Sequence, residues 1–353
     1  MMLIGVDPHK SSHTATAVDP ATNTDQGSAR IDATNTGYRR LLVWARQWPK
    51  RTWAVENAEG LGHHLAMWLV ASGEDVVDVA PAATARVRQL SRGGRRKNDR
   101  IDAAAAASVA ALHGDARPVV AETHADSLAL LDERRKNLSS NRTRSVNQLH
   151  ALLRELLPGG APTDLTATKA AAVLRRLRPI TATDRVRKSI AKDLLADIKR
   201  YDTQLADNAA AMDELLDLHG TTLREIPGVG PVMAARIIGR TRRASRFPNA
   251  AAYANYTGTA PVEIASAESS RHRLSRYGDR ELNSALHTIA MIQIRMRTSV
   301  GRSYYDKKIG AGKSPKEAKR CLKRRLADRC WRTMTRDERQ AARTTLTRHT
   351  DAA

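Results

Sequence analysis

The sequence predicts an α/β domain followed by a mostly helical remainder. Through the first third of the chain, short apolar runs typical of strands alternate with amphipathic helical stretches, which is the pattern of an α/β layer. Farther along, apolar residues recur at helical intervals over long stretches. We expect three domains: an α/β domain at residues 1–120, a helical coiled-coil linker at 121–218 and an α-helical domain at 219–353.

The α/β domain is expected to begin with a hairpin. Residues 3–6 and 14–18 are short apolar runs joined by a polar turn, so they fit two antiparallel strands. Further strands are expected at residues 52–55 and 75–79, and helices at 38–47 and 61–71.

Four acids of this domain are candidate metal ligands. Asp7 and Glu56 each follow an apolar strand, and sites in open α/β sheets form beyond the carboxyl ends of strands. Asp99 and Asp102 are three residues apart before an alanine-rich run, so a helix places both on one face. Taken singly, each acid also fits a plain turn or helix-cap residue. Four that converge would suit Mg²⁺ or Mn²⁺, which can stabilise both oxygens of a phosphodiester displacement.

The charge of the chain indicates a nucleic-acid partner. The net charge is +22 and the pI is about 10.6, which favours nucleic acid over a membrane surface. With a single Phe, phosphate contacts are more plausible than base stacking. A basic run beside the paired aspartates suits a polyanion held next to a metal: Arg95, Arg96 and Lys97.

The lack of a recognisable targeting signal and the low cysteine content lead us to expect a cytoplasmic protein. No apolar run approaches the ~20 residues that cross a bilayer, and no secretory signal opens the sequence. Two cysteines make neither a disulfide framework nor a zinc site. We therefore expect a cytoplasmic, nucleoid-associated protein with no membrane partner.

The middle of the chain holds two long predicted helices, at residues 125–157 and 184–218. The second carries apolar residues three, four or seven apart, a heptad-like seam. An intramolecular helical hairpin and a coiled coil that also dimerises fit this seam equally well.

The C-terminal third carries a turn that suits phosphate binding. A helix is expected to end near Glu225, followed by a Pro-Gly-x-Gly turn and a helix from Pro231, a helix-hairpin-helix pattern. Gly228 and Gly230 let the backbone approach a phosphate without reading sequence. The basic tail after residue 301 fits a nucleic-acid contact and a solvated helix face about equally.

A serine-rich loop follows at residues 262–273. On its residues alone it is a polar phosphate-binding loop, although a hydroxyl among arginines can also attack a phosphodiester. The arginines in and after the loop are Arg271, Arg273 and Arg276.

Three blocks of the sequence resemble the DEDD transposases of the IS110 insertion sequences, which are related to the Piv-type DNA invertases. Their order and spacing match through the first third of the chain. They read Gly5-Val6-Asp7-Pro8-His9-Lys10, Val55-Glu56-Asn57-Ala58-Glu59-Gly60 and Lys97-Asn98-Asp99-Arg100-Ile101-Asp102-Ala103. The resemblance implies an RNase H-like domain similar to the Holliday-junction resolvase RuvC. The metal-binding tetrad that it implies is Asp7, Glu56, Asp99 and Asp102. Asn57 and the three residues after it replace the Ala-Thr-Gly expected there.

The resemblance extends to the C-terminal domain, where the family carries a helix-hairpin-helix, a Gly-x-x-Pro and a nucleophilic serine. Counting from Pro261, Ser266 matches that serine. Ser269 and Ser270 are close rivals because the loop is shorter than expected, and Ala267 stands where the family has Gly. The resemblance also implies a coiled coil used in assembly, with a homodimer or homotetramer as the expected state.

The expected function is that of a DNA transposase-recombinase. The acids would bind Mg²⁺ (or Mn²⁺) and position or activate the serine, which attacks a phosphodiester and forms a covalent phosphoserine intermediate that a second strand resolves. The expected partners are donor and target DNA and, by the resemblance alone, a structured bridge RNA that guides the enzyme. Two alternatives stay open: a metal-dependent Holliday-junction-type nuclease that uses water, and a non-catalytic nucleic-acid-binding protein.

Overall fold

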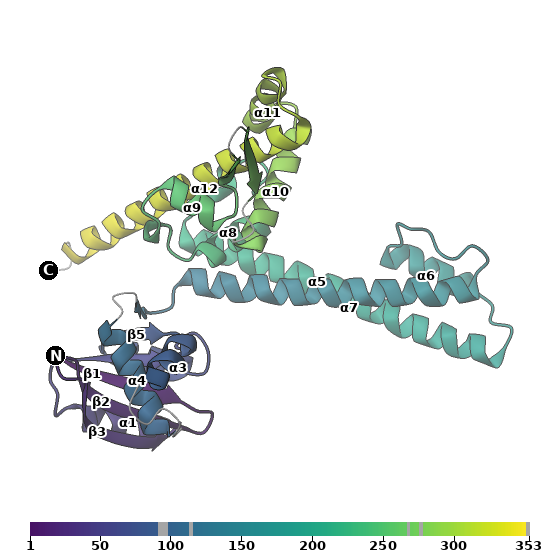
Figure 1. The fold of residues 1–353 in the computed structure, drawn as a ribbon. Helices are drawn as coiled ribbons and strands as arrows, with labels where there is room; N and C mark the ends of the chain where they lie inside the picture. Colours follow the sequence, from purple (N-terminus) through teal and green to yellow (C-terminus); the bar gives the residue numbers. More distant parts are fainter. Residues whose placement is uncertain (91–97, 113–115, 267–268, 275–277, 351–353) are drawn as a thin grey trace. The chain divides into compact units, whose positions relative to one another are not determined.

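The computed structural model describes residues 1–90, 98–112, 116–266, 269–274 and 278–350. The chain divides into two compact units, Met1–Glu122 and Thr123–Ala353 (Figure 1). The further division of the second unit at residue 218 stays a prediction. No helix within these described ranges is both long and apolar enough to cross a membrane.

The first unit is built on a six-stranded mixed sheet in the order β3-β2-β1-β4-β5-β6. The first three strands are antiparallel neighbours, β4 and β5 run parallel to β1, and β6 is antiparallel to β5. This arrangement confirms the predicted RNase H-like fold class. The strands are β1 (Met2–Pro8), β2 (Ser12–Asp19), β3 (Thr24–Asp32), β4 (Arg51–Glu56), β5 (Val76–Val79) and β6 (Arg117–Pro118).

The predicted hairpin and the two later strands are confirmed, whereas β3 was not predicted. Its sequence, Thr-Asp-Gln-Gly-Ser-Ala-Arg-Ile-Asp, has a single large apolar residue, Ile31. As the edge strand beside β2 it buries only Ile31 and leaves its other residues partly or fully exposed, so it needs little apolar character to form.

Helices cover both faces of the sheet: α1 (Asn35–Ala45), α2 (His63–Ala71), α3 (Pro81–Leu90) and α4 (Asp99–Leu112). Successive residues of β1 point to opposite faces. Ile4 and Val6 join the core beneath α1 and α2, and Leu3 packs with Ala107 of α4. By the same alternation, Asp7 belongs to the face that α4 covers.

Two long helices, α5 (His124–Leu156) and α7 (Ala182–His219), form an intramolecular hairpin in the second unit, with α6 (Ala167–Arg176) at its far end (Figure 1). Their contacts run antiparallel, because Arg135 donates to the Leu205 carbonyl at 2.8 Å and Arg142 pairs with Asp202. Both helices begin with a threonine capping box. Dimerisation through this hairpin stays a prediction.

The remainder of the second unit is a mostly helical bundle with a small hairpin. Its core joins Leu128 and Met212, from the base of the long helices, to Ile237, Leu286 and Cys330. The elements are η1 (Leu223–Glu225), α8 (Pro231–Thr241), η2 (Ala244–Arg246), α9 (Ala250–Tyr256), β7 (Pro261–Ser266), β8 (Ser269–Leu274), α10 (Arg280–Arg295), α11 (Val300–Gly310) and α12 (Pro315–Thr350).

The structure refines one local expectation in this bundle and contradicts another. The α-helix before the Pro-Gly-x-Gly turn ends at His219, where Gly220 adopts a left-handed φ of 67°, and only the single 3-10 turn η1 reaches Glu225. The serine-rich stretch is an antiparallel hairpin, β7–β8, rather than an irregular loop.

Candidate active site

Two acids meet at the carboxyl ends of neighbouring parallel strands. In the β1–β4 pairing Val6 is the partner of Val55, so Asp7 and Glu56 follow side by side. Val55 lies in the core beneath α1 and α2, while Ala54 packs with Val109 of α4. Alternation therefore gives Glu56 and Asp7 the same face of the sheet.

Helix α4 brings the other two acids to this face. Asp99 and Asp102 lie in its first turn, and the backbone N–H of Arg100 donates to Asn98 Oδ1 at 3.0 Å as a helix cap. The helix rests directly on β1 at Gly5, where a Cβ would meet the Ala103 carbonyl oxygen at 1.8 Å. A glycine is required at this close approach of two backbones.

Gly5→Ala is expected to destabilise the protein by about 2–3 kcal/mol, because α4 would have to move off the sheet. Urea unfolding followed by circular dichroism measures the loss. Gly73→Ala is a comparison at a glycine whose Cβ would meet nothing within 4 Å but whose φ of 81° adds strain. A Gly5→Ala protein as stable as the wild type would contradict the close packing of α4.

Three of the four acids line one small cavity of about 210 Å³. Asp7 and Asp102 are nearly buried, with 8% and 7% of their surface exposed. The lining residues are Asp7, His9, Glu56, Pro81, Thr84, Ala85, Arg88 and Asp102.

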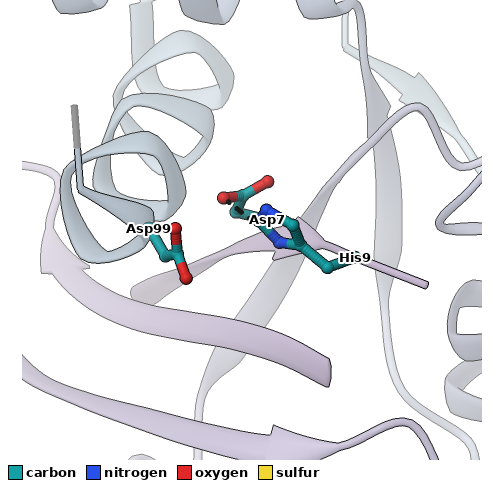
Figure 2. A group of neighbouring side chains, drawn as sticks. All are labelled: Asp7, His9 and Asp99. Atoms are coloured by element: carbon teal, nitrogen blue, oxygen red, sulfur yellow. Dashed lines mark ion pairs between the residues drawn. The ribbon is translucent and has the colours of Figure 1, made fainter. Parts of the chain in front are cut away.

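The fourth acid lies beside this cavity. Asp99 groups with Asp7 and His9, and one ligand atom of each lies within 4.8 Å of the others. Figure 2 shows Asp99 on the first turn of α4, facing Asp7 and His9 at the end of β1. All four predicted acids therefore gather at one edge of the sheet.

Burial and the neighbouring acids both disfavour the ionised form of Asp7. Burial raises the pKa of its carboxyl to about 6, against an opposite effect of His9. The negative charges of Glu56, Asp102 and Asp99 act in the same direction as burial. A site that penalises its own ionisation in this way favours a bound cation.

Cationic and hydroxyl side chains contact the other three acids. Arg88 Nη1 lies 2.7 Å from Asp102 Oδ1, and Arg30 Nη1 lies 3.1 Å from Asp99 Oδ2. Thr84 Oγ1 donates to Glu56 Oε1 at 2.5 Å and holds that carboxylate toward α3.

Sequence reasoning missed His9, Thr84 and Arg88 as site residues. His9 had a usable signal, since it lies two residues after Asp7 in the same block. Thr84 and Arg88 had none, because their partners lie on other elements. The predicted basic residues Arg95, Arg96 and Lys97 lie outside the described residues.

The loop after Glu56 explains the unusual Asn57. Asn57 has a φ of 51°, a left-handed conformation that asparagine tolerates better than most residues. Ala58 donates its N–H to Asp78 Oδ1 at 2.7 Å, which ties the loop to β5. The nearby acids Glu59 and Asp75 are exposed, as expected of surface residues.

The candidate nucleophile lies on the β7–β8 hairpin of the second unit. Ser266 ends β7 and pairs with Ser269, the first residue of β8, while Ser270 pairs with Ala265. Arg271 and Arg273 follow in β8, and Arg276 lies outside the described residues.

The two ends of this hairpin are clamped together at its base. A Cβ on Gly278 would meet the Gly258 backbone nitrogen at 2.2 Å, and Asp279 donates its N–H to the Tyr256 carbonyl at 2.7 Å. Arg240 Nε pairs with both carboxylate oxygens of Asp279 at 2.9 and 2.8 Å. The strand pair thus projects from a fixed base.

A second layer of contacts supports that base. The side-chain amide of Asn283 donates to the carbonyls of Thr257 and Gly258 at 3.0 and 2.9 Å. The buried Lys323 donates to Asn283 Oδ1 at 2.5 Å, and burial lowers the pKa of this lysine to about 8.

In the Pro-Gly-x-Gly turn before α8, one glycine packs against α10 and the other is open. Gly228 has a φ of 85°, and a Cβ there would press on Ile292 at 3.1 Å. Gly230 precedes α8 with nothing within 4 Å of a Cβ position, and Pro231 occupies the first helical turn.

Two transposase family models match the chain. Residues 4–158 match the transposase model of the DEDD type of IS110, and residues 220–306 match the model of the transposase IS116/IS110/IS902 family.

Curated relatives are similar over most of their length, each at 28% identity. The match to the uncharacterized 44.8 kDa protein of insertion element IS116 from Streptomyces clavuligerus covers 95% of this chain and 95% of that protein. The uncharacterized 42 kDa protein of insertion element IS900 from Mycobacterium paratuberculosis is matched over 81% of this chain and 83% of its own. The mini-circle putative transposase for IS117 from Streptomyces coelicolor is matched over 74% and 77%.

Among solved structures the chain is similar to Thermus thermophilus RuvC, at 14% identity over 34% of this chain and 100% of that one, with a TM-score of 0.27. The two matched models describe one family and together span more than half of the chain. The chain therefore belongs to the IS110 family of transposases, enzymes that cut and rejoin DNA.

Proposed function

We propose that this transposase cleaves DNA at a Mg²⁺ centre held by four carboxylates and uses a serine as its nucleophile. The proposed ligands are Asp7, Glu56, Asp99 and Asp102, and the proposed nucleophile is Ser266. The observation that carries the metal part is the gathering of all four carboxylates at one edge of the sheet. The serine rests on the family resemblance, supported by its position at the turn of a hairpin with a clamped base.

The donor set fits a hard divalent cation. Carboxylate oxygens are the ligands that Mg²⁺ and Mn²⁺ prefer. Burial, with a smaller effect of the neighbouring carboxylates, raises the pKa of Asp7, and a bound cation would offset this cost of ionisation. His9 adds a nitrogen donor beside Asp7, which Mn²⁺ accepts more readily than Mg²⁺. When bound, the metal would supply charge stabilisation to the oxygens that enter and leave the phosphorus.

The serine chemistry proceeds in two balanced displacements. The Ser266 hydroxyl oxygen attacks phosphorus and loses its proton, the bond from phosphorus to one strand oxygen breaks, and that oxygen takes up a proton. A hydroxyl from a second strand then attacks the same phosphorus. The serine–phosphorus bond breaks, and Ser266 regains its proton as the strands are rejoined.

The RNA partner and the oligomeric state are proposed from the family resemblance. A structured bridge RNA and a homodimer or homotetramer are part of the proposal, and the net charge of +22 is compatible with binding RNA as well as DNA.

The metal part of the proposal is tested by heat unfolding. Asp7→Asn is expected to raise the Tm of the metal-free protein at pH 7, with a gain on the order of 1–2 kcal/mol. Folding raises the pKa of Asp7 from its ordinary value of 3.8 to about 6, so the stability of the folded wild type falls as the pH rises through this window. Near pH 4, where Asp7 is protonated in the folded protein, the gain should vanish.

Added Mn²⁺ should reverse the order of the two Tm values, so that the wild type becomes the more stable protein. It is expected to raise the Tm of the wild type and leave that of Asp7→Asn almost unchanged, because a ligand stabilises only the state that binds it. Equal Mn²⁺-induced shifts in both proteins would contradict the assignment of Asp7 as a ligand.

A further inference from the structure

The long C-terminal helix α12 carries an unusual row of exposed arginines. Six arginines alternate four and three residues apart, so they share one side of the helix over about 27 Å. Leu322, Leu326, Cys330 and Met334 are buried on its other side, against the bundle. We call the exposed row the arginine face: Arg325, Arg329, Arg332, Arg336, Arg339 and Arg343.

The arginine face lines two adjoining grooves of about 650 and 500 Å³. Arg332 and Arg336 border both grooves. The first groove has four arginines and no acid among its described lining residues. In Figure 1 the last turns of α12, in yellow, extend past the helices on which its earlier turns pack.

The acids of the same stretch already have partners within the protein. Asp337 accepts from Thr221 and from the backbone and hydroxyl of Thr222, between 2.8 and 3.0 Å. Asp328, which lines the second groove, pairs with Arg324, an arginine outside the arginine face. Glu338 accepts the N–H groups of Ala244 and Ser245, at 2.5 and 3.0 Å, so it caps η2.

Three members of the arginine face are therefore uncompensated. Within the described part of the chain, Arg329, Arg332 and Arg339 have no ion pair. Arg325 instead lies over the Tyr304 ring at 4.6 Å. Arg336 donates to Thr222 Oγ1 at 2.7 Å, and its Nε lies 3.8 Å from Asp337 Oδ1. Like charges in a row on one helix repel each other, so a polyanion that spans this surface would relieve the repulsion.

We propose that the arginine face of α12 docks the sugar–phosphate backbone of duplex DNA. The guanidinium fork matches phosphate oxygens, and evenly spaced forks suit a regular polyanion. The surface offers little for stacking single-stranded bases, since Trp331 turns its indole N–H inward to the Ala244 carbonyl at 3.2 Å. Both family-model matches end before α12, so this surface is additional to the matched transposase regions.

The test uses the full chain and a fluorescent duplex DNA of arbitrary sequence, in EDTA so that no cleavage takes place. The variant Arg329→Gln/Arg332→Gln/Arg339→Gln is expected to bind at least about 10-fold more weakly near 0.1 M salt. Its plot of log K against log salt should be shallower by about 2.7, or 0.9 per lost phosphate contact. The matching Arg→Lys triple variant should keep the wild-type slope, because its charges remain, and circular dichroism verifies folding.

The matched control removes three exposed arginines of α5: Arg134, Arg144 and Arg154. Changed to Gln, they lower the net charge equally and are expected to weaken binding less than about 3-fold. Equal losses in the two Gln triple variants would overturn the proposal, because binding would then follow net charge alone. A loss that appears with duplex RNA and not with duplex DNA would overturn the assignment to DNA. These readouts involve neither the metal ligands nor Ser266, so they are independent of the proposed chemistry.

Discussion

Asp7→Asn is expected to lower transposition in cells by about 10³-fold. The substitution keeps the shape of the side chain but removes its charge from the point where β1, β4 and α4 meet. Losing one carboxylate of a metal centre removes several kcal/mol of charge stabilisation at the reacting phosphate, and about 4 kcal/mol corresponds to this factor. Quantitative PCR of the excised element's junction measures the change, with protein levels verified by immunoblot.

The matched control for this experiment is Asp75→Asn. Asp75 lies in the same unit, just before β5, and is exposed. It should keep activity within about 3-fold of the wild type, because surface substitutions of this kind change stability little. If Asp7→Asn transposed as well as Asp75→Asn, the non-catalytic alternative would gain support and the metal centre would lose its role.

Ser266→Ala is expected to abolish the covalent protein–DNA intermediate and, with it, strand exchange. Only the serine oxygen can form the phosphoester bond, so the loss should be complete rather than partial. Denaturing gel electrophoresis of reactions on labelled element ends detects the adduct as a protein band that carries DNA. The matched variants Ser269→Ala and Ser270→Ala, on the facing strand, should keep both the adduct and strand exchange.

The pattern across the three serines identifies the chemistry. Loss of the adduct in Ser269→Ala or Ser270→Ala alone would move the nucleophile to that residue. Full strand exchange by all three variants would favour the alternative nuclease that uses water. In that case the metal-binding results would still stand, since Ser266 belongs to a different unit from the carboxylates.

Local patterns in the sequence were sufficient to predict the framework of the candidate site. Apolar runs ending in Asp7 and Glu56 predicted strands whose carboxyl ends carry acids, and the parallel β1–β4 pairing sets these ends side by side. The three-residue spacing predicted Asp99 and Asp102 on one helical turn. Gly5, quoted only as part of a motif, turned out to decide how closely that helix approaches the strand.

Contacts between separate elements were beyond sequence reasoning. Arg88 on α3 pairs with Asp102 on α4, and Thr84 on α3 holds Glu56 at the end of β4. Neither pair can be detected from local periodicity, because each side chain on its own fits a solvated polar position. The heptad-like seam was also ambiguous for this reason: Ile198 is buried in the hairpin, while Val186 and Ile190 are 58% and 46% exposed.

The serine hairpin shows a different limit. Polar, serine-rich segments read as loops because they lack the apolar alternation of a half-buried strand. Here the strand pair is fixed from outside its own sequence, by Asp279 and Asn283 at the start of α10 and by Arg240 on α8. Its conformation depends on tertiary contacts that local propensity cannot report.

The close packing of α4 on the backbone of β1 restricts how the candidate site can change. Asp99 and Asp102 lie on one turn of a helix whose backbone packs directly on the backbone of Gly5, with no side chain between them. The two carboxylates therefore keep a fixed spacing. A shift of the helix by one residue would place a different carbonyl against Gly5. Substitutions can therefore change the side chains at positions 99 and 102, but they can hardly change the distance between these two positions.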